Sequence, residues 1–243
     1  MKSRLDQLMV QKKLVVTRSQ AENWIKLGQV KVAGRIVTKP GVQLSSDTEV
    51  ILLAKEQYVS RAGLKLASVA QALSLDFTNK VILDVGSSTG GFTDYALQHG
   101  AKKVIAVEVG TNQLHPTLQG HPSIELHEKT DIRAIQSLSL PVDIVVIDVS
   151  FISLRELLPH IFSLVGPKAN VVAMVKPQFE AATISLTKHR GIIKNDAQRR
   201  QILQAFEQWV KDFARIEAKS DSQVAGAKGN RERFYLLRPL LTI

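Results

Sequence analysis

The 243-residue sequence contains no cysteine, which excludes disulfide bonds and thiolate metal sites. Its six histidines lack paired metal-ligand spacing of the H-E-x-x-H type, so no metal site is expected. No apolar run approaches the roughly 18 residues that a membrane-spanning helix needs, and the charged N-terminus lacks the apolar stretch of a secretory signal. We therefore expect a cytoplasmic protein with no metal and no membrane partner, and the sequence carries no signal for an oligomeric state.

Acidic residues are in the minority, because 32 Lys and Arg face 22 Asp and Glu and give a formal net charge of +10. Residues 1–60 hold ten of the basic and five of the acidic side chains, so half of the excess charge lies in the first 60 residues. This concentration indicates a separate basic module that contacts phosphate groups, with a solvated basic face as the alternative. The predicted RNA-binding residues are Arg4, Lys12, Lys13, Arg18, Lys26, Lys31 and Arg61.

The basic module has the pattern of two short helices, a small hairpin and a further strand. Thr17 or Ser19 is expected to cap the second helix, and Gly28 to end it. A turn at Ala33-Gly34 separates the two hairpin strands. The expected helices cover 4–10 and 19–27, and the expected strands cover 30–32, 35–37 and 50–53.

From residue 58 onward, strands and helices alternate, which is typical of a mostly parallel sheet covered on both faces. Two strands end the pattern and predict an antiparallel hairpin at the sheet edge. We therefore expect a small α+β domain at 1–57 and an α/β, Rossmann-like domain at 58–243, with loose loops at 180–195 and 225–231. The expected strands cover 81–85, 103–107, 143–147, 171–175, 215–218 and 234–237, and the expected helices cover 61–73, 91–99, 153–164 and 197–212.

Over residues 81–94, the first strand of the second domain leads into a glycine-rich turn and then into a helix. Its G-x-x-x-G-G spacing differs from the G-x-G-x-x-G of dinucleotide sites, and no Lys-Ser/Thr pair of a P-loop follows. Asp84 before the turn and Glu108 after the next strand suit a cationic amino acid and a ribose diol, and S-adenosyl-L-methionine carries both. An ordinary β-α turn without a cofactor is the alternative.

Further charged residues follow other strands at the same edge of the sheet. Asp148 and Lys176 come directly after two strands, and Asp131 lies in a loop that would reach an adenine amino group. Ligands of doubly wound sheets bind beyond the carboxyl ends of the strands, so these residues predict one cleft, although each alone fits a solvated boundary position. The predicted cofactor-binding residues are Asp84, Gly86, Ser87, Gly90, Gly91, Phe92, Glu108, Asp131 and Asp148.

Several N-terminal segments carry a family resemblance. The segments RLDQLMV at 4–10, TRSQA at 17–21 and GQVKV at 28–32 resemble the α-L RNA-binding motif of ribosomal small-subunit protein four. This resemblance covers most of residues 3–53 and implies binding to structured RNA. That family commonly has Asn before the hairpin glycine, where this chain has Ala33.

Five further motifs, in order along the chain, resemble the TlyA (haemolysin A) family of FtsJ-like methyltransferases. The resemblance implies a class I methyltransferase fold, S-adenosyl-L-methionine as cofactor, and 2′-O-methylation of ribosomal RNA, at a cytidine, with rRNA or ribosomal subunits as partners. It also implies a catalytic tetrad of Lys65, Asp148, Lys176 and Glu232, and Ala62 stands where the family commonly has Gly. The motifs are VSRAGLKL at 59–66, DVGSSTGGFTD at 84–94, DVSFIS at 148–153, VKPQFE at 175–180 and GNRE at 229–232.

A ribose hydroxyl is a poor nucleophile, so an enzyme of this type must position the oxygen and help to remove its proton. Lys176 is the candidate base, or else it orients the hydroxyl while water takes the proton. Lys65 is its candidate partner and a possible RNA contact, with Asp148 and Glu232 holding both lysines. The alternatives are a non-catalytic RNA- or ribosome-binding factor and a membrane-lytic protein, which needs an apolar span or amphipathic basic helix for which the sequence shows no strong candidate.

Overall fold

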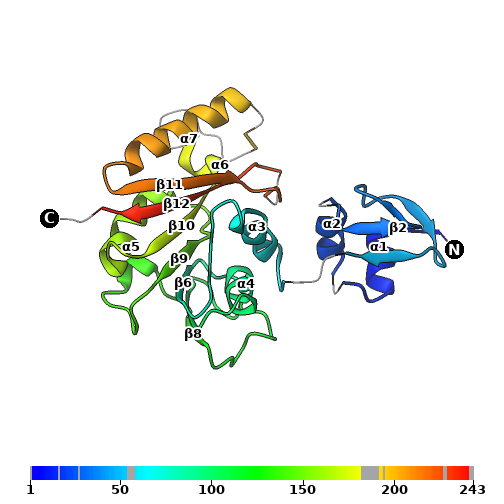
Figure 1. Cartoon of the computed structure of the whole chain (residues 1–243), viewed down its shortest axis with the longest axis horizontal. Helices are drawn as coiled ribbons and strands as arrows, with labels where there is room; N and C mark the ends of the chain where they lie inside the picture. Colours follow the sequence, from blue (N-terminus) through cyan, green and yellow to red (C-terminus); the bar gives the residue numbers. More distant parts are fainter. Residues whose placement is uncertain are drawn as a thin grey trace. The chain divides into compact units, whose positions relative to one another are not determined.

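The structure is a computed structural model that describes residues 2–15, 17–26, 28–53, 58–181, 192–193, 195–226 and 229–240. Within it the chain forms two units, Met1–Arg61 and Ala62–Ile243 (Figure 1). Most of the loop expected at 180–195, and the middle of the one expected at 225–231, lie outside the described residues.

In the N-terminal unit, α1 (Leu5–Gln11) and α2 (Arg18–Lys26) pack together and bury Leu5, Leu8 and Ile25. Thr17, the residue before α2, caps the helix, which is one of the two caps expected from the sequence. The Gln20 amide donates to Thr17 Oγ1 and the Thr17 amide donates to Gln20 Oε1, both at 3.2 Å, which is a capping box. The strands are β1 (Lys2–Arg4), β2 (Val30–Val32), β3 (Arg35–Ile36), β4 (Gln43–Ser45) and β5 (Val50–Leu52), paired as β1-β4 and as β3-β2-β5.

The expected hairpin turn joins β2 to β3 through two residues with left-handed backbone. Ala33 has φ 46° and Gly34 has φ 79°, as a two-residue turn of the mirror-image type I class requires. Glycine adopts this conformation freely, whereas alanine is strained there. The Asn that the related RNA-binding motif commonly has would tolerate the position better than Ala33 does.

The C-terminal unit is built on a seven-stranded sheet of order β11-β12-β10-β9-β6-β7-β8. The pairs among β10, β9, β6, β7 and β8 are parallel, and β12 runs antiparallel to both of its neighbours. The expected α/β fold with an antiparallel C-terminal hairpin is therefore confirmed. The strands are β6 (Val81–Val85), β7 (Lys103–Val107), β8 (Ile124–His127), β9 (Ile144–Ile147), β10 (Asn170–Val175), β11 (Ala214–Asp221) and β12 (Arg233–Pro239).

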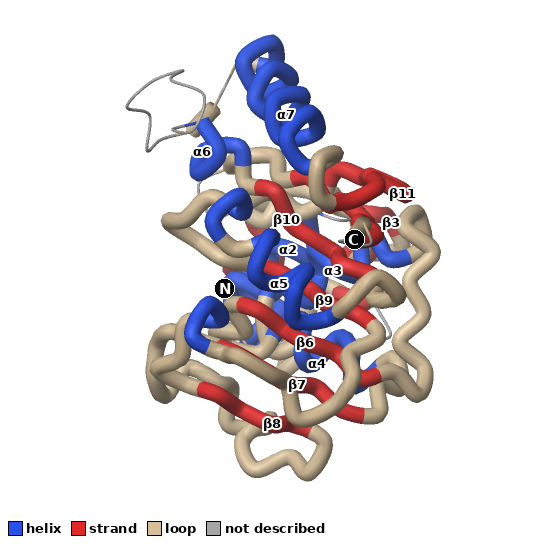
Figure 2. The backbone as a smooth tube through the Cα atoms, turned by 90° about the vertical axis from the view of Figure 1, so that its left-hand side faces the viewer, coloured by secondary structure: helices blue, strands red, loops and turns tan. Residues whose placement is uncertain are grey.

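Helices cover both faces of this sheet (Figures 1 and 2). Leu83 and Val85 of β6 face the apolar core that includes side chains of α5 and α7. Asp84, between them, points to the other face, where the Thr93 hydroxyl of α4 reaches it and where Phe92 packs near Phe234 of β12. The helices are α3 (Arg61–Ala70), α4 (Gly91–Gln98), α5 (Leu158–Val165), α6 (Pro177–Glu180) and α7 (Asp196–Val210), with 3-10 turns at Ile132–Ala134 and Leu154–Glu156.

The structure corrects several expected elements. The helix expected at 153–164 is a 3-10 turn at Leu154–Glu156 followed by α5 from Leu158, and the helix expected at 61–73 ends at Ala70. β8 was not predicted, because its sequence Ile124-Glu125-Leu126-His127 alternates too briefly to distinguish a strand from a loop. The three-residue strands β1 and β4 and the four-residue α6 were missed for the same reason, namely their length.

Candidate active site

The loops that follow β6, β7, β9 and β10 converge at the carboxyl edge of the sheet, where β6 lies between β7 and β9. Two cavities open there, one of about 430 Å³ and one of about 150 Å³. Both are lined by Gly86, Ser88, Asp148 and Ser150, so they adjoin. The sequence-predicted cleft is therefore present as two connected compartments.

The glycine spacing of the turn follows from close contacts. Gly86 has φ 82°, and a Cβ at this position would lie 2.7 Å from the backbone oxygen of Asp148. Gly90 has φ 86°, and a Cβ there would lie 2.5 Å from the Leu118 side chain. Gly91 then begins α4. The first glycine lets the turn touch the β9 loop, and the second lets the helix start against the β7–β8 connection.

Asp84 is completely buried at the smaller cavity. Its Oδ2 accepts a hydrogen bond of 2.6 Å from Thr93 Oγ1, whereas its Oδ1 has no hydrogen-bond partner among the described residues. The nearby Ser87 hydroxyl, also buried, has none either. Burial raises the pKa of Asp84 to about 7, despite the opposing effect of the Thr93 hydrogen bond. Buried polar atoms are rarely unpaired, so this pair fits a ligand that brings a cation and a hydrogen-bond partner.

Glu108 and Asp131 line the larger cavity. Glu108 Oε2 accepts from the Ser88 amide at 2.9 Å and Oε1 from the Gly110 amide at 2.7 Å, so this carboxylate joins the β7 loop to the glycine turn. Asp131 is paired with Arg133, whose guanidinium lies 2.6 Å away and holds the pKa of the carboxyl below its usual range. Each carboxylate oxygen has more than one lone pair, so both groups retain acceptor capacity toward a ligand.

The four predicted tetrad residues form two ion pairs. Lys176 Nζ lies 2.6 Å from Asp148 Oδ1 and donates to Ser150 Oγ at 2.8 Å. Lys65 Nζ lies 2.5 Å from Glu232 Oε2. Asp148 and Lys176 line the smaller cavity, whereas Lys65 and Glu232 are not among its lining residues. Helix α3 reaches this cavity through Ala62, one turn before Lys65 on the same helix face.

Three side chains at this edge were missed by sequence reasoning. Ser150 binds Lys176, and Phe151 is 91% exposed with a left-handed φ of 69°. The Phe151 ring lies 5.4 Å from that of Phe179, which in turn lies 5.9 Å from Lys176 Nζ. Both phenylalanines stand in motifs that the resemblance singled out, but nothing in a motif indicates that an aromatic ring is exposed. An exposed ring on a strained backbone is a feature of binding sites.

Glu180 links the two loops that carry Asp148 and Lys176. Its buried carboxylate accepts from Ser153 Oγ at 2.6 Å and from the Leu154 amide at 2.8 Å. The β9 loop is thereby attached to α6, directly after Lys176. No periodic pattern points to this contact, because it joins residues 26 and 27 positions apart.

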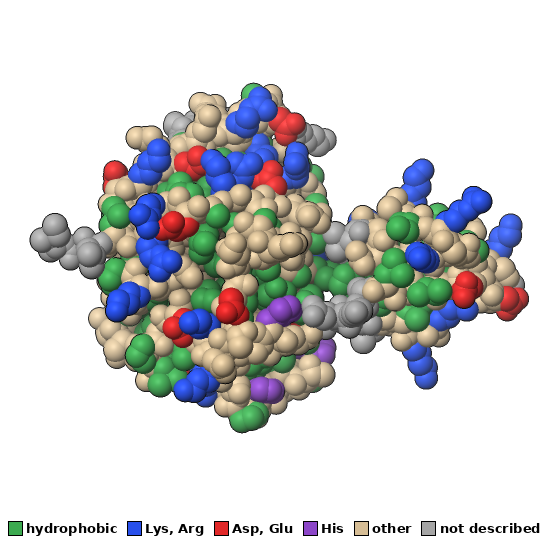
Figure 3. All heavy atoms as spheres, in the orientation of Figure 1, with side chains coloured by type: hydrophobic (Ala, Val, Ile, Leu, Met, Phe, Trp, Pro, Cys, Tyr) green, Lys and Arg blue, Asp and Glu red, His purple; other side chains and the backbone are tan. Residues whose placement is uncertain are grey.

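In the N-terminal unit, two of the predicted RNA-binding residues, Arg4 and Arg18, donate hydrogen bonds to a buried aspartate. Asp6 is fully buried, and its carboxylate accepts hydrogen bonds from Arg4 (2.8 and 3.0 Å) and Arg18 (2.9 Å). Lys12, Lys13 and Lys26 are exposed, and Figure 3 shows Lys and Arg side chains projecting from this unit. Lys26 lies 3.7 Å from Glu22, and Lys31 and Arg61 are partly exposed.

The described residues show neither a metal centre nor a membrane-spanning helix. No group of three or more His, Cys, Asp or Glu side chains there is arranged to hold a metal ion. Among the same residues, no helix combines the length and the apolar character that crossing a bilayer requires.

The strand order and the turn after β6 define a Rossmann-like α/β protein. Comparison with known proteins identifies the family: the model of the FtsJ-like methyltransferases matches residues 58–238, and the S4 domain model matches residues 3–50. The chain therefore belongs to the FtsJ-like methyltransferase family.

Individual relatives extend over nearly the whole chain. The "Putative rRNA methyltransferase YqxC" of Bacillus subtilis is 37% identical, over 95% of this chain and 84% of its own. The "16S/23S rRNA (cytidine-2'-O)-methyltransferase TlyA" of Mycobacterium tuberculosis is 31% identical, over 98% of this chain and 90% of its own. A solved structure, "Putative hemolysin from Streptococcus thermophilus", is 34% identical with a TM-score of 0.72, over 99% of this chain and 89% of that one.

Proposed function

We propose that this protein is an S-adenosyl-L-methionine-dependent ribose 2′-O-methyltransferase that acts on ribosomal RNA, at a cytidine. The observation that carries the proposal is that Lys176, Asp148 and Ser150 line the same cavity as the buried carboxylate of Asp84, whose Oδ1 has no hydrogen-bond partner among the described residues. Membership of the FtsJ-like family, the S4 domain match and the activity in the name of the Mycobacterium tuberculosis relative support it.

The two cavities match the two halves of the proposed cofactor, which when bound supplies an electrophilic methyl group on a sulfonium. Asp84 and Ser87 would hold the ammonium and carboxylate end in the smaller cavity. Glu108 would accept hydrogen bonds from the ribose hydroxyls, and Asp131 would lie near the adenine in the larger cavity. Gly86 and Phe92 line the smaller cavity, Gly90 and Gly91 form the start of α4 behind it, and Asp148 borders both compartments.

Lys176 is the proposed group for the ribose hydroxyl. A lysine ammonium has three donors; Ser150 Oγ accepts from one of them at 2.8 Å, and Asp148 Oδ1 lies 2.6 Å away as the ion-pair partner that orients the ammonium. Donor capacity therefore remains for the 2′-oxygen, so these contacts favour the role of orienting the hydroxyl over that of removing its proton. Phe151 at the mouth of the larger cavity offers an exposed face on which the target base would stack.

The domain boundary is proposed at 57/58, with residues 1–57 gripping RNA and residues 58–243 performing methyl transfer in the cytoplasm. Phosphate contacts are assigned chiefly to Lys12, Lys13 and Lys26, because Arg4 and Arg18 are bound to Asp6. RNA binding should weaken steeply with salt. Replacing both Lys12 and Lys13 with Gln should reduce the slope of log affinity against log salt by about 1.5. An unchanged slope would contradict these two phosphate contacts.

The test is transfer of labelled methyl from S-adenosyl-L-methionine to undermodified ribosomal subunits and to free rRNA. Wild type is compared with Lys176→Ala and with Lys168→Ala, an exposed lysine away from the cavities. We expect label on a ribose, located by resistance to alkaline cleavage, retained by Lys168→Ala and lost by Lys176→Ala. A folded wild-type protein that binds RNA but transfers no methyl would indicate a non-catalytic RNA-binding factor instead. Leakage from liposomes would revive the lytic alternative.

A further inference from the structure

Glu232 is the tetrad residue farthest along the chain, and it lies outside regular secondary structure, immediately before β12. Its carboxylate is 2% exposed and pairs with Lys65 of α3. A buried ion pair of this kind depends on geometry. Each charge loses its hydration on burial, and only close attraction to its partner offsets that loss. The backbone that presents Glu232 must therefore be held in place.

Three consecutive carbonyl oxygens around Glu232 each accept one hydrogen bond. Asn230 O accepts from the Gly226 amide at 2.9 Å, and Glu232 O accepts from the Ser222 amide at 3.0 Å. The middle one, Arg231 O, accepts from the side chain of Arg199 at 3.0 Å. The flanking bonds come from the same loop as Glu232, whereas the middle bond comes from helix α7.

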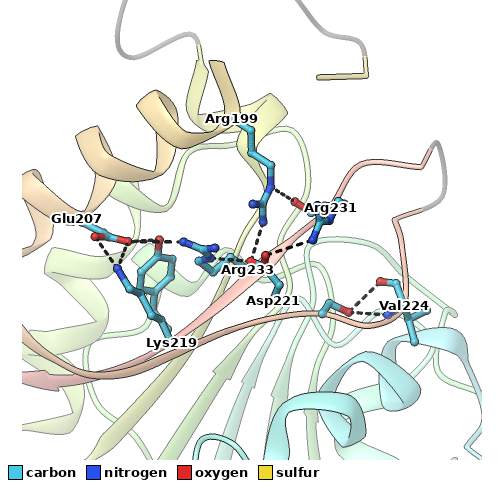
Figure 4. A network of polar contacts seen from close by, with 9 residues as sticks. Arg199, Glu207, Lys219, Asp221, Val224, Arg231 and Arg233 are labelled. Atoms are coloured by element: carbon cyan, nitrogen blue, oxygen red, sulfur yellow. Dashed lines mark hydrogen bonds and ion pairs between the residues drawn. The ribbon is translucent and has the colours of Figure 1, made fainter. Parts of the chain in front are cut away.

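Arg199 belongs to a larger polar network centred on Asp221 at the end of β11 (Figure 4). Asp221 Oδ1 accepts from Arg199 at 2.7 Å and from Arg233 at 2.6 Å, and Arg231 lies 3.7 Å from Oδ2. Arg199 is itself buried. The residues on both sides of Glu232 are thus tied, through Asp221 and Arg199, to β11 and to α7.

The space around the Glu232 carboxylate leaves little freedom. A Cβ at Gly226 would lie 2.6 Å from Glu232 Oε1, so the loop backbone covers the carboxylate on one side, and Lys65 meets it at Oε2. The same loop is attached to α3 through the Gln223 amide, which donates to Ser68 Oγ at 3.3 Å. A small shift of residues 231–233 would therefore separate Glu232 from Lys65.

We propose that Arg199 and Asp221 are positioning residues for methyl transfer, which act by holding Glu232 against Lys65. This inference rests on the proposed function for its effect on the reaction. The cofactor compartments are lined by Ala62 of α3 and by the loops after β6, β7, β8, β9 and β10, and Arg199 makes no hydrogen bond to these lining residues within the described part of the chain. Loss of Arg199 should therefore lower the rate of methyl transfer and leave cofactor affinity unchanged.

The matched control is a change at Lys219, which lies with Glu207 at the other end of the polar network drawn in Figure 4. Lys219 binds Glu207 at 2.8 and 2.9 Å and, in the described part of the chain, makes no hydrogen bond or ion pair with residues 230–232. We expect Arg199→Gln to lower kcat by about 10- to 100-fold with little change in KM, whereas Lys219→Gln stays near wild type. Arg199→Lys, which keeps the charge but not the two-pronged guanidinium, should fall between them. Affinity for S-adenosylhomocysteine and the thermal midpoint of each variant show that the fold persists.

A double-mutant cycle tests the mechanism. If Arg199 acts through Glu232, then Arg199→Gln should change kcat less than about 3-fold in a Glu232→Gln background. Equal losses in both backgrounds, or a kcat for Arg199→Gln equal to that of Lys219→Gln, would overturn the proposal.

Hydrogen exchange separates this inference from the proposed function, because it needs no activity. Amides of 229–236 should exchange faster in Arg199→Gln than in wild type, and not in Lys219→Gln. Unchanged exchange would overturn the positioning role. A wild-type chain that transfers no methyl group would instead defeat the proposed function, while the exchange result would still decide whether Arg199 holds Glu232.

Discussion

Each unit buries one aspartate completely, and the two carboxylates have opposite surroundings. Asp6 accepts hydrogen bonds from Arg4, Arg18 and the Gln7 amide. Burial alone would raise its pKa, but these bonds lower it to about 2. Asp84 accepts one hydrogen bond from a side chain, has an oxygen with no hydrogen-bond partner among the described residues, and has its pKa raised to about 7 by burial.

This difference separates a buried carboxylate that stabilises the fold from one that is suited to bind a ligand. Asp6 has its cations within the same unit, so its charge stabilises the fold. No ion pair joins Asp84 to a cation among the described residues, so ionising it is unfavourable until a positively charged group arrives. Unfavourable burial of this kind is retained where binding requires it, which makes Asp84 the stronger candidate for function.

The largest expected effect follows from removing the charge of Asp84. Asp84→Asn keeps an acceptor for Thr93 but removes the partner of the ligand's ammonium, so affinity for S-adenosylhomocysteine should fall about 100-fold. The same variant should not lower the thermal midpoint at pH 8, because it removes an unpaired buried charge. Calorimetric titration and thermal unfolding measure the two effects. If Asp84→Asn bound S-adenosylhomocysteine as tightly as wild type, Asp84 would not be the partner of the ligand's ammonium.

Removing the charge of Asp6 should have the reverse result. Asp6→Asn weakens the hydrogen bonds from both arginines and should lower the free energy of unfolding of the N-terminal unit by about 2 kcal/mol. Urea denaturation measures the loss, and S-adenosylhomocysteine affinity should not change. A loss of cofactor affinity without loss of stability would show that the assignment of the two aspartates is wrong.

The two carboxylates should also respond oppositely to pH. The pKa of Asp84 rises from 3.8 to about 7 on folding, so the stability that depends on its protonated form is complete below about 3.8 and is lost as pH rises to about 7. The pKa of Asp6 falls from 3.8 to about 2, so its contribution is present above about 3.8 and lost as pH falls toward 2.

The ionisation of Asp84 should also make ligand affinity depend on pH. S-adenosylhomocysteine, whose ammonium pairs with ionised Asp84, should bind up to about tenfold more weakly for each pH unit below 7 and with constant affinity above it. Titrations from pH 5.5 to 8 would measure this slope. Asp84→Asn should give a flat profile, and a similar slope in that variant would assign the dependence to another group.

The smallest expected effect concerns the strained turn of the N-terminal unit. Ala33 has φ 46°, where Asn is better tolerated, so Ala33→Asn should raise the free energy of unfolding by about 0.5 kcal/mol. Ala33→Val should lower it, because a β-branched residue is disfavoured there. Urea midpoints of the two variants, compared with that of Asp6→Asn, separate backbone strain from charge pairing in one unit.

Much of the fold was predictable because it is encoded locally. The run from Val81 to Gly91 predicts a strand, a turn and the start of a helix, and the structure has all three; Glu108, Asp148 and Lys176 after their strands predict a ligand site at the carboxyl edge. What the sequence missed was short or distant in the chain. The basic residues of the N-terminal unit looked alike in sequence, yet Arg4 and Arg18 reach a buried acid while Lys12 and Lys13 remain exposed.

The alternation of strands and helices, the glycine positions and the residue types at the carboxyl edge can all be read from the sequence, because periodicity and backbone preference act over a few residues. The pairing of the charges is visible only in the folded chain. Lys176 meets Asp148, Lys65 meets Glu232, and Arg199 meets Asp221 across separations along the chain that no local pattern records. Pairing depends on distances in space, and these exist only once the sheet has brought its loops together.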